Sequence, residues 1–447
     1  MIRRTILGLL KFALRVYFRR IEIIGREHVP RKSPVIFVLN HPNALVDPVF
    51  LFCLAPRRVS FLAKAPLFQM PVIGYFVRAL DSLPVYRRKD EGEDISRNEE
   101  TFVVARKLLA RGGTIGICPE GVSHSEPRLL PIKTGAARIA LGAVSTGEVV
   151  DLKVVPAGLY YTSKTKFRSS VLLYFGKPID VSPVALDDSG TIPREAVREL
   201  SNRIECALRE VILDAEHEEA LQTISRAEKI FSAEADEESR ESLAQELQLQ
   251  QRFIKAYTVL RQHAPERLRR LELRITRFEQ ELTQAGVSAD DFSPPASPAA
   301  VFLHILIRIS FFTILILPAL LGVMVHYPAY RLGRYVATRF SRDEEDVVST
   351  IKIISGILLL PLTWLLSAAL VYELLGWEPA LATLFIMPLL GYLAVRFFEE
   401  FEKSVGGLRA LAFFLMRRRF FIRLLAERKA IHKEILALGE ETAIASQ

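Results

Sequence analysis

The stretch VIFVLNHPNALVDPVF, residues 35–50, decides how the first half of this chain is interpreted. Its first apolar run ends at Asn40 and His41, and Asp47 opens a second apolar run six residues after the histidine. A short β-branched run, a polar break and a longer apolar segment are typical of a strand, a loop and a helix. A carboxylate can hold a histidine in the tautomer that takes a proton from an alcohol, so the pair suits general-base chemistry.

Each of these two residues also has a purely structural interpretation. Asp47 followed by Pro48 is typical of a helix start, with the aspartate as N-cap and the proline in the first turn. His41 alone is compatible with a hydrogen-bonded structural histidine. The assignment of a site therefore depends on what the rest of the sequence places beside this pair.

The segments that follow repeat the alternation of strand and helix patterns. The expected strands are short apolar runs at 35–39, 59–63, 83–86, 114–118, 153–161 and 171–175. Helical patterns lie between them, for example at 98–111 and 135–144. The sequence therefore predicts an α/β fold with a central, mostly parallel sheet flanked by helices. In such folds the site lies at the carboxyl ends of the strands, where His41 is placed.

The composition points to a membrane rather than to nucleic acid. Of 447 residues, 50% are hydrophobic and the formal net charge is +8; the mean hydropathy is +0.21. Positive charge suits nucleic acid, an anionic membrane surface or phosphorylated substrates, but no nucleic-acid-binding motif accompanies it. The three cysteines are too scattered for a disulfide framework or a metal site, which indicates a reducing compartment.

Membrane contact is expected at both ends of the chain. The first twenty residues contain six basic and no acidic side chains, and their spacing predicts a basic amphipathic helix on the bilayer surface. Three apolar stretches follow much later, at about 301–326, 353–372 and 379–396. The last two suit a transmembrane hairpin. Arg308 and Pro318 interrupt the first, which could span or enter and return. If the basic segments 331–342 and 396–429 are both cytoplasmic, the first stretch does not fully cross.

Three further blocks place polar residues at ends of expected strands. Arg87 and Arg88 follow the strand in LDSLPVYRRKD, residues 80–90. The block TIGICPEGVSHSEPRLLPIKTGAARIAL, residues 114–141, sets candidate polar and glycine residues after a strand. KVVPAGLYY, residues 153–161, centres on Pro156. A base, carboxylates and cations could thus converge on one phosphorylated alcohol.

This ordered set of blocks resembles the glycerophospholipid acyltransferase family. The matching residues are Asn40-His41 with Asp47, then Arg87, then Cys118-Pro119-Glu120-Gly121, and then Pro156. Five residues separate His41 from Asp47 where the family has four, and Cys118 stands where phenylalanine is usual. The forms HPNALVDP and PEGVSH look closest to the fungal-type glycerol-3-phosphate and dihydroxyacetone-phosphate acyltransferases.

The resemblance implies a reaction and a role for each matching residue. A fatty acyl group would pass from a thioester, acyl-CoA or acyl carrier protein, to the hydroxyl of glycerol-3-phosphate, dihydroxyacetone phosphate or lysophosphatidate. His41 would be the general base and Asp47 its orienting partner; no resident cofactor and no metal are implied. Substrate-binding residues would be Arg87 on the acceptor phosphate, Glu120 placing Arg87 or a glycerol hydroxyl, and also Gly121, Pro119, Ser123, Lys133 and Lys64.

The expected organisation has six parts. They are a membrane-surface helix at 1–30, an acyltransferase domain at 31–212, a charged helical region at 213–287, a linker at 288–300, membrane helices at 301–400 and a basic amphipathic helix at 401–447. From about 195 to 285 the chain is rich in Glu, Arg, Gln, Leu and Ala, and Pro265 divides this stretch into helices, of which the first is expected to be long and highly charged. The protein would be an integral membrane protein with its catalytic domain on the cytoplasmic face.

Two alternatives remain open at this point. Cys118 with His41 and Asp47 could form a thioesterase or cysteine acyltransferase that works through an acyl-enzyme. The chain could also be a non-enzymatic lipid-binding membrane protein, although a binder does not need an aligned base, carboxylate and arginine.

Overall fold

The computed structural model describes residues 1–87, 97–188, 190–216, 219–223, 226, 242–286, 298–341 and 344–445. Arg88 and most of the expected linker, 288–297, lie outside these ranges. The chain forms two compact units, each described here by itself. The first contains 1–214, 242–247 and 337–353, and the second contains 215–241, 248–336 and 354–447.

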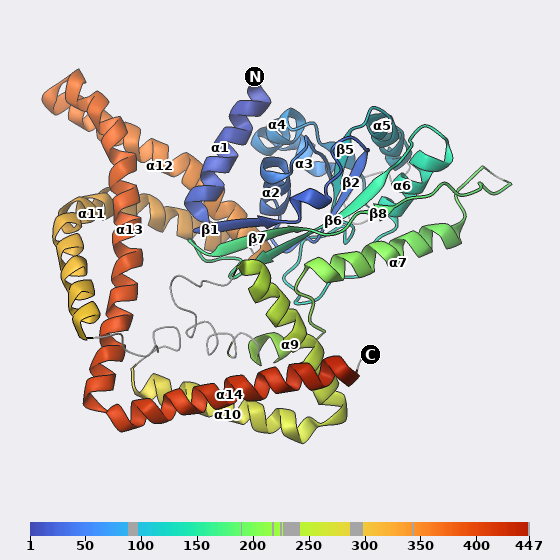
Figure 1. The fold of residues 1–447 in the computed structure, drawn as a ribbon. Helices are drawn as coiled ribbons and strands as arrows, with labels where there is room; N and C mark the ends of the chain where they lie inside the picture. Colours follow the sequence, from blue (N-terminus) through green and yellow to red (C-terminus); the bar gives the residue numbers. More distant parts are fainter. Residues whose placement is uncertain are drawn as a thin grey trace. The chain divides into compact units, whose positions relative to one another are not determined.

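The first unit is built on one sheet of eight strands, seven of which form a continuous path (Figure 1). Their order along this path is β1-β7-β6-β2-β5-β3-β4, and β8 pairs with β6. The strands are β1 Arg20–Ile24, β2 Val35–Leu39, β3 Ser60–Lys64, β4 Leu83–Val85, β5 Thr114–Ile117, β6 Lys153–Tyr161, β7 Ser170–Phe175 and β8 Ile179–Asp180. All pairings are parallel except those of β6 with β7 and β8. The predicted mostly parallel α/β sheet is confirmed.

Helices cover both faces of this sheet, as the alternation of buried residues in β2 requires. Ile36 and Val38 face a core that is closed by α5, α6 and α7. Phe37 and Leu39 face the opposite core, which is closed by α1 and α2. The helices of this unit are α1 Ile2–Tyr17, α2 Val46–Leu54, α3 Pro66–Gln69, α4 Pro71–Ala79, α5 Asn98–Ala110, α6 Gly135–Ser145 and α7 Arg194–Val211, with a 3-10 turn at Arg26–His28.

Two local expectations differ from the structure. The N-terminal helix ends at Tyr17, and β1 occupies part of the segment 1–30 that was expected to be helical. β1 forms because its residues pair in register with β7, from Arg20 with Ser170 to Ile24 with Tyr174. The first charged helix is also shorter than expected, since α7 ends at Val211.

The second unit is helical. Its described elements include α9 Leu243–His263, α10 Pro265–Gln284, α11 Pro298–Phe340, α12 Glu345–Leu375, α13 Trp377–Met416 and α14 Arg418–Ala445, of which α9, α11 and α12 each begin or end in the first unit. Pro265 begins α10, as predicted. Three helices are long and apolar enough to cross a membrane: Leu306–Phe340, Glu345–Leu375 and Trp377–Glu402.

The C-terminal helix α14 packs on α10 through both apolar and charged side chains. Phe421, Leu424 and Ile431 of α14 are buried. Arg274 of α10 pairs with Glu427 and Glu434 of α14. Protein therefore covers the apolar face of α14 that was expected to lie on the bilayer surface.

Candidate active site

The candidate site begins with a hydrogen bond between His41 and Asp47. The loop 40–45 joins the carboxyl end of β2 to α2, and it brings His41 Nδ1 within 2.9 Å of Asp47 Oδ2. The carboxylate is fully buried, and the histidine side chain is 19% exposed. The five-residue spacing thus still allows the carboxylate to hold the ring through Nδ1, which leaves Nε2 as the nitrogen that can take a proton.

Asp47 is not the N-cap of α2, so that structural interpretation is wrong. The helix begins at Val46, with Leu45 in the cap position. The Asp47 carboxylate instead accepts the backbone N–H of Asn43 at 2.7 Å and the hydroxyl of Tyr161 at 2.7 Å. Three donors therefore fix both carboxylate oxygens.

Tyr161 is a site residue that the sequence did not single out. It lies at the end of β6, which is the neighbour of β2 in the sheet. Burial, followed by the nearby Asp47 charge, raises the pKa of Tyr161 well above its ordinary value. The phenol therefore stays protonated and donates to Asp47 at all physiological pH values.

Glu120 joins the loop after β5 to the histidine loop. Its Oε1 accepts the backbone N–H of His41 at 3.0 Å, and its Oε2 accepts that of Leu130 at 3.0 Å. Oε2 also pairs with His124 Nε2, and the backbone N–H of His124 donates to the carbonyl oxygen of His41 at 3.2 Å. Glu120 thus holds the backbone of the site, and its expected role in positioning Arg87 or a glycerol hydroxyl stays a prediction.

Arg87 and Lys133 meet at Gly121. Arg87 Nη1 donates to the Gly121 carbonyl oxygen at 2.9 Å. Gly121 has a φ of +70°, and a Cβ there would lie 2.5 Å from Lys133 Nζ. The left-handed backbone therefore favours glycine here, and the flexible Lys133 side chain lies directly over it. The backbone N–H of Lys133 also donates to Pro119 O at 2.7 Å, which ties this loop together.

The remaining predicted residues are less closely connected to the histidine. Lys64 is exposed at the carboxyl end of β3, at the same sheet edge as the site. Ser123 is half-buried and Pro119 is buried in the loop after β5. Lys164 is a further cation that the sequence did not single out. Its pKa is lowered, because burial has a larger effect than the opposing charges of Asp47 and other acidic residues nearby. Asn43 Nδ2 donates to the Lys164 carbonyl oxygen at 3.4 Å.

The titration of His41 is set by opposing effects. Burial acts to lower its pKa, whereas the charge of a Cys118 thiolate and the Asp47 carboxylate act to raise it, and the result is a pKa well above the ordinary value. Burial raises the pKa of Cys118 itself. Cys118 is therefore a thiol near neutral pH, where the Asp47 hydrogen bond and charge are what act against burial at His41.

Within the described ranges, no three His, Cys, Asp or Glu side chains are grouped closely enough to hold a metal ion. The chemistry that the described side chains can supply is proton transfer at His41 and binding of anions by Arg87, Lys133 and Lys164.

Comparison with known proteins identifies both parts of the chain. Residues 20–160 match the family model described as Acyltransferase, and this range holds the His41–Asp47 pair and the loop with Glu120. The chain thus carries an acyltransferase-family segment. Residues 234–443 match the model described as Glycerol-3-phosphate acyltransferase 2 C-terminal domain. Together the two models cover most of the strands of the sheet and most of the helical second half.

Three fungal relatives align over large parts of this acyltransferase. Glycerol-3-phosphate O-acyltransferase 2 of Saccharomyces cerevisiae is 26% identical over 60% of this chain and 37% of the relative. Glycerol-3-phosphate O-acyltransferase 1 of the same yeast is 24% identical over 81% of this chain and 60% of the relative. An uncharacterized acyltransferase of Schizosaccharomyces pombe is 23% identical over 91% and 76%. The alignments thus span less than two thirds of both yeast glycerol-3-phosphate acyltransferases.

Among solved structures, the 1-acyl-sn-glycerophosphate acyltransferase of Thermotoga maritima is 20% identical. It covers 47% of this chain and 79% of its own, with a TM-score of 0.34.

Proposed function

We propose that this protein is a membrane-bound acyltransferase that moves a fatty acyl group from an acyl thioester to the hydroxyl of a glycerol-phosphate acceptor. The observation that carries the proposal is the hydrogen bond between His41 Nδ1 and the buried Asp47 carboxylate at the carboxyl edge of the sheet. The names of the yeast relatives favour glycerol-3-phosphate as the acceptor.

The proposed reaction needs neither a metal nor an acyl-enzyme. His41 Nε2 takes the proton of the acceptor hydroxyl while that oxygen attacks the thioester carbonyl carbon. A carbon–oxygen bond forms, the carbon–sulfur bond breaks, and the leaving thiolate takes the proton back from the imidazolium. Asp47 stabilises the imidazolium between these two steps, because its charge lies 2.9 Å from Nδ1.

The acceptor phosphate would bind near Arg87 and Lys133, which meet over Gly121. Arg87 presents a planar fork suited to phosphate oxygens, whereas Lys133 acts as a point charge. The catalytic domain would face the cytoplasm, where acyl thioesters and the reducing conditions suited to free cysteines are found.

The experiment is an acyl-transfer assay on the full chain in membranes with labelled acyl-CoA. Glycerol-3-phosphate, dihydroxyacetone phosphate and lysophosphatidate are offered in parallel. We expect transfer to glycerol-3-phosphate, and a loss on the order of 10²–10⁴ in rate for His41→Ala. His263→Ala, at an exposed position near the end of α9, is the matched control. Equal activity of the two variants, or no transfer to any acceptor, would refute the proposal.

A further inference from the structure

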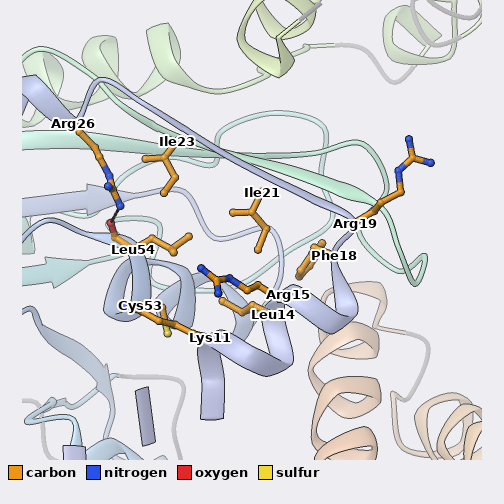
Figure 2. A pocket seen from close by; sticks show the side chains of 10 residues that line it. All are labelled: Lys11, Leu14, Arg15, Phe18, Arg19, Ile21, Ile23, Arg26, Cys53 and Leu54. Carbon is orange, nitrogen blue, oxygen red and sulfur yellow. Dashed lines mark hydrogen bonds between the residues drawn. The ribbon is translucent and has the colours of Figure 1, made fainter. Parts of the chain in front are cut away.

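A cavity of about 530 Å³ lies between α1, β1 and the end of α2 (Figure 2). Its apolar surface comes from Leu14 and Phe18 of the α1 end and from Ile21 and Ile23 of β1. Neither His41 nor Arg87 lines it. Its volume is in the range of small-molecule sites, roughly 300–1,000 Å³.

The rim of this cavity is strongly positive. Four of the ten lining residues are basic, namely Lys11, Arg15, Arg19 and Arg26, and none is acidic. Figure 2 shows the Arg15 guanidinium reaching across the cavity toward Leu54, whereas that of Arg19 points away from the other lining side chains. Within the described part of the chain, none of these four side chains is in an ion pair with a carboxylate.

The alternation of β1 explains why no carboxylate enters the cavity. Ile21 and Ile23 line it, so Glu22 between them points to the other side of the strand. There the Glu22 carboxylate pairs with Arg20 at 2.9 Å and accepts the backbone N–H of Leu243 at 3.0 Å. The positive charge at the cavity therefore has no compensating group from this strand.

The same helix presents large apolar side chains to solvent. Ile2, Leu9, Phe12 and Val16 of α1 are exposed by 60%, 42%, 60% and 39%. A helix with exposed apolar side chains and a basic face is typical of one that lies in a membrane interface. The cavity therefore opens beside a helix that is suited to the headgroup layer.

We propose that this cavity binds the phosphate headgroup of an anionic phospholipid. Lys11 and Arg15 supply charge-assisted hydrogen bonds to the phosphate oxygens, and the floor of Ile21 and Ile23 receives the glycerol and the first methylene groups. The apolar floor selects a lipid rather than free phosphate, and the missing carboxylates disfavour a zwitterionic headgroup, whose ammonium would find no partner. This site is separate from acyl transfer and goes beyond the proposed function.

The test is equilibrium binding of fluorescent dioctanoyl phosphatidic acid to the purified full chain in a neutral detergent. Dioctanoyl phosphatidylcholine, inorganic phosphate and glycerol-3-phosphate are the competitors. Lys11→Gln combined with Arg15→Gln should raise the Kd about tenfold or more, because two charged partners are lost. Arg4→Gln is the matched control, since Arg4 is an exposed arginine of the same helix that does not line the cavity.

Binding should persist in His41→Ala and in excess glycerol-3-phosphate, which separates this site from the proposed acceptor site. Phosphatidylcholine and inorganic phosphate should compete weakly. The charge-conserving variant Lys11→Arg with Arg15→Lys should bind the lipid, unlike Lys11→Gln with Arg15→Gln. Equal effects of the double variant and of Arg4→Gln would reduce the interaction to general surface charge. Full displacement by glycerol-3-phosphate, or by inorganic phosphate at the same concentration as the lipid, would also overturn the proposal.

Discussion

Asp47 is a buried carboxylate whose two oxygens are both committed to named donors. Asn43 and Tyr161 bind it at 2.7 Å each, and His41 lies 2.9 Å from it. A buried charge persists when hydrogen bonds to its ionised form offset the loss of hydration. The charge of this carboxylate acts to raise the pKa of the His41 imidazole, against the effect of burial.

The pH dependence of acyl transfer follows from this pair. Because neutral imidazole is the form that accepts a proton, activity is lost as the pH falls through the raised pKa of His41. The acidic limb of the wild-type profile should therefore lie above about pH 6.5. Asp47→Asn removes the charge that raises this pKa, so the limb should move to lower pH and the maximal rate should fall on the order of 10².

The measurement is a pH–rate profile under conditions that saturate both substrates. Tyr161→Phe is the companion variant, because it removes one hydrogen bond and keeps the Asp47 charge; its acidic limb should stay above about pH 6.5. An Asp47→Asn limb at the wild-type position would show that Asp47 does not control the titration of the base.

Cys118 distinguishes direct transfer from transfer through an acyl-enzyme. Burial raises its pKa, which leaves a neutral thiol that is a poor nucleophile near pH 7. Cys118→Ala should therefore keep most of the activity, with a stability loss of about 1 kcal/mol from the vacated volume. Wild-type protein given acyl-CoA alone should show no adduct by intact-mass spectrometry.

Cys206→Ala serves as the control for this experiment, because Cys206 is exposed and open to incidental acylation. A thioester that is absent in Cys118→Ala, present in Cys206→Ala and discharged by acceptor would establish the acyl-enzyme instead.

At the residue scale, the sequence predicted the histidine pair but not its support. His41, Asp47, Arg87 and Glu120 stand in short motifs close to strand ends, so local pattern locates them. Tyr161 reaches Asp47 across 114 positions of sequence. That contact depends on β6 lying next to β2 in the sheet, and no local pattern states which strands are neighbours.

At the scale of elements, the strands that are buried on both faces were predictable from their apolar runs. β2 and β6 were predicted with their observed bounds, Val35–Leu39 and Lys153–Tyr161. β1 was missed because its five residues follow directly on an amphipathic helix and are all half-buried. It becomes a strand through its pairing with β7, about 150 positions later in the chain.

The packing of α7 on β6 depends on a glycine in the strand. A Cβ at Gly158 would lie 1.9 Å from the Val211 carbonyl oxygen of α7. Gly158→Ala should therefore push α7 away from the sheet and destabilise the first unit by about 1–3 kcal/mol. Because this helix closes one of the two cores, the loss should appear as a melting temperature lower by several degrees.

Thermal unfolding of the full chain in detergent measures this change. Gly8→Ala is the control, since Gly8 lies within α1 and a Cβ there would meet nothing within 4 Å. It should leave the melting temperature unchanged or raise it, because alanine favours a helix. An unchanged melting temperature for Gly158→Ala would mean that α7 can shift freely.

At the scale of the whole molecule, α12 and α13 have the dimensions of a transmembrane hairpin. They are joined at Gly376, and Ser355 lies 21 positions before it and Glu400 lies 24 positions after it. At about 1.5 Å per residue these lengths match a hydrocarbon core of about 30 Å. A hairpin that spans the bilayer would place Ser355 and Glu400 at the same membrane boundary, opposite to Gly376.

Contacts of α11 within the second unit show how deep that helix reaches. Near its start, Arg308 pairs with Glu400 at 2.5 Å. Further along, His326 accepts the indole N–H of Trp364 at 2.9 Å. Trp364 lies nine positions into α12 beyond Ser355, a depth of about 14 Å.

The end of α11 returns to the boundary where it started. A Cβ at Gly333 would lie 3.4 Å from the Ser355 Cβ. Pro318 and Pro328 lie inside α11, on either side of His326 in the sequence. Proline is a common cause of helix bends, and α11 is bent in Figure 1. We infer that α11 enters to about the middle of the bilayer and returns, although it is long enough to cross.

The first unit includes the connection between α11 and α12. It includes residues 337–353, which connect the end of α11 to the start of α12. Within this unit the Tyr17 and Ser349 hydroxyls are hydrogen-bonded at 2.9 Å, and Lys352 Nζ donates to Thr165 O at 2.7 Å. Arg339 near the end of α11 therefore belongs to the first unit, and we predict that both face the cytoplasm.

Cysteine labelling in sealed, oriented vesicles tests this topology. In a Cys53→Ala, Cys118→Ala background, exposed Cys206 reports the side of the acyltransferase domain. With α11 re-entrant, Leu306→Cys and Phe340→Cys should both react with an impermeant maleimide from the Cys206 side, and Trp377→Cys should react from the other side. A helix that crossed the bilayer would put Leu306→Cys and Phe340→Cys on opposite sides. Labelling of Leu306→Cys from the same side as Trp377→Cys would therefore refute re-entry. The contacts of Arg308 with Glu400 and of Gly333 with Ser355 require both ends of α11 at one boundary.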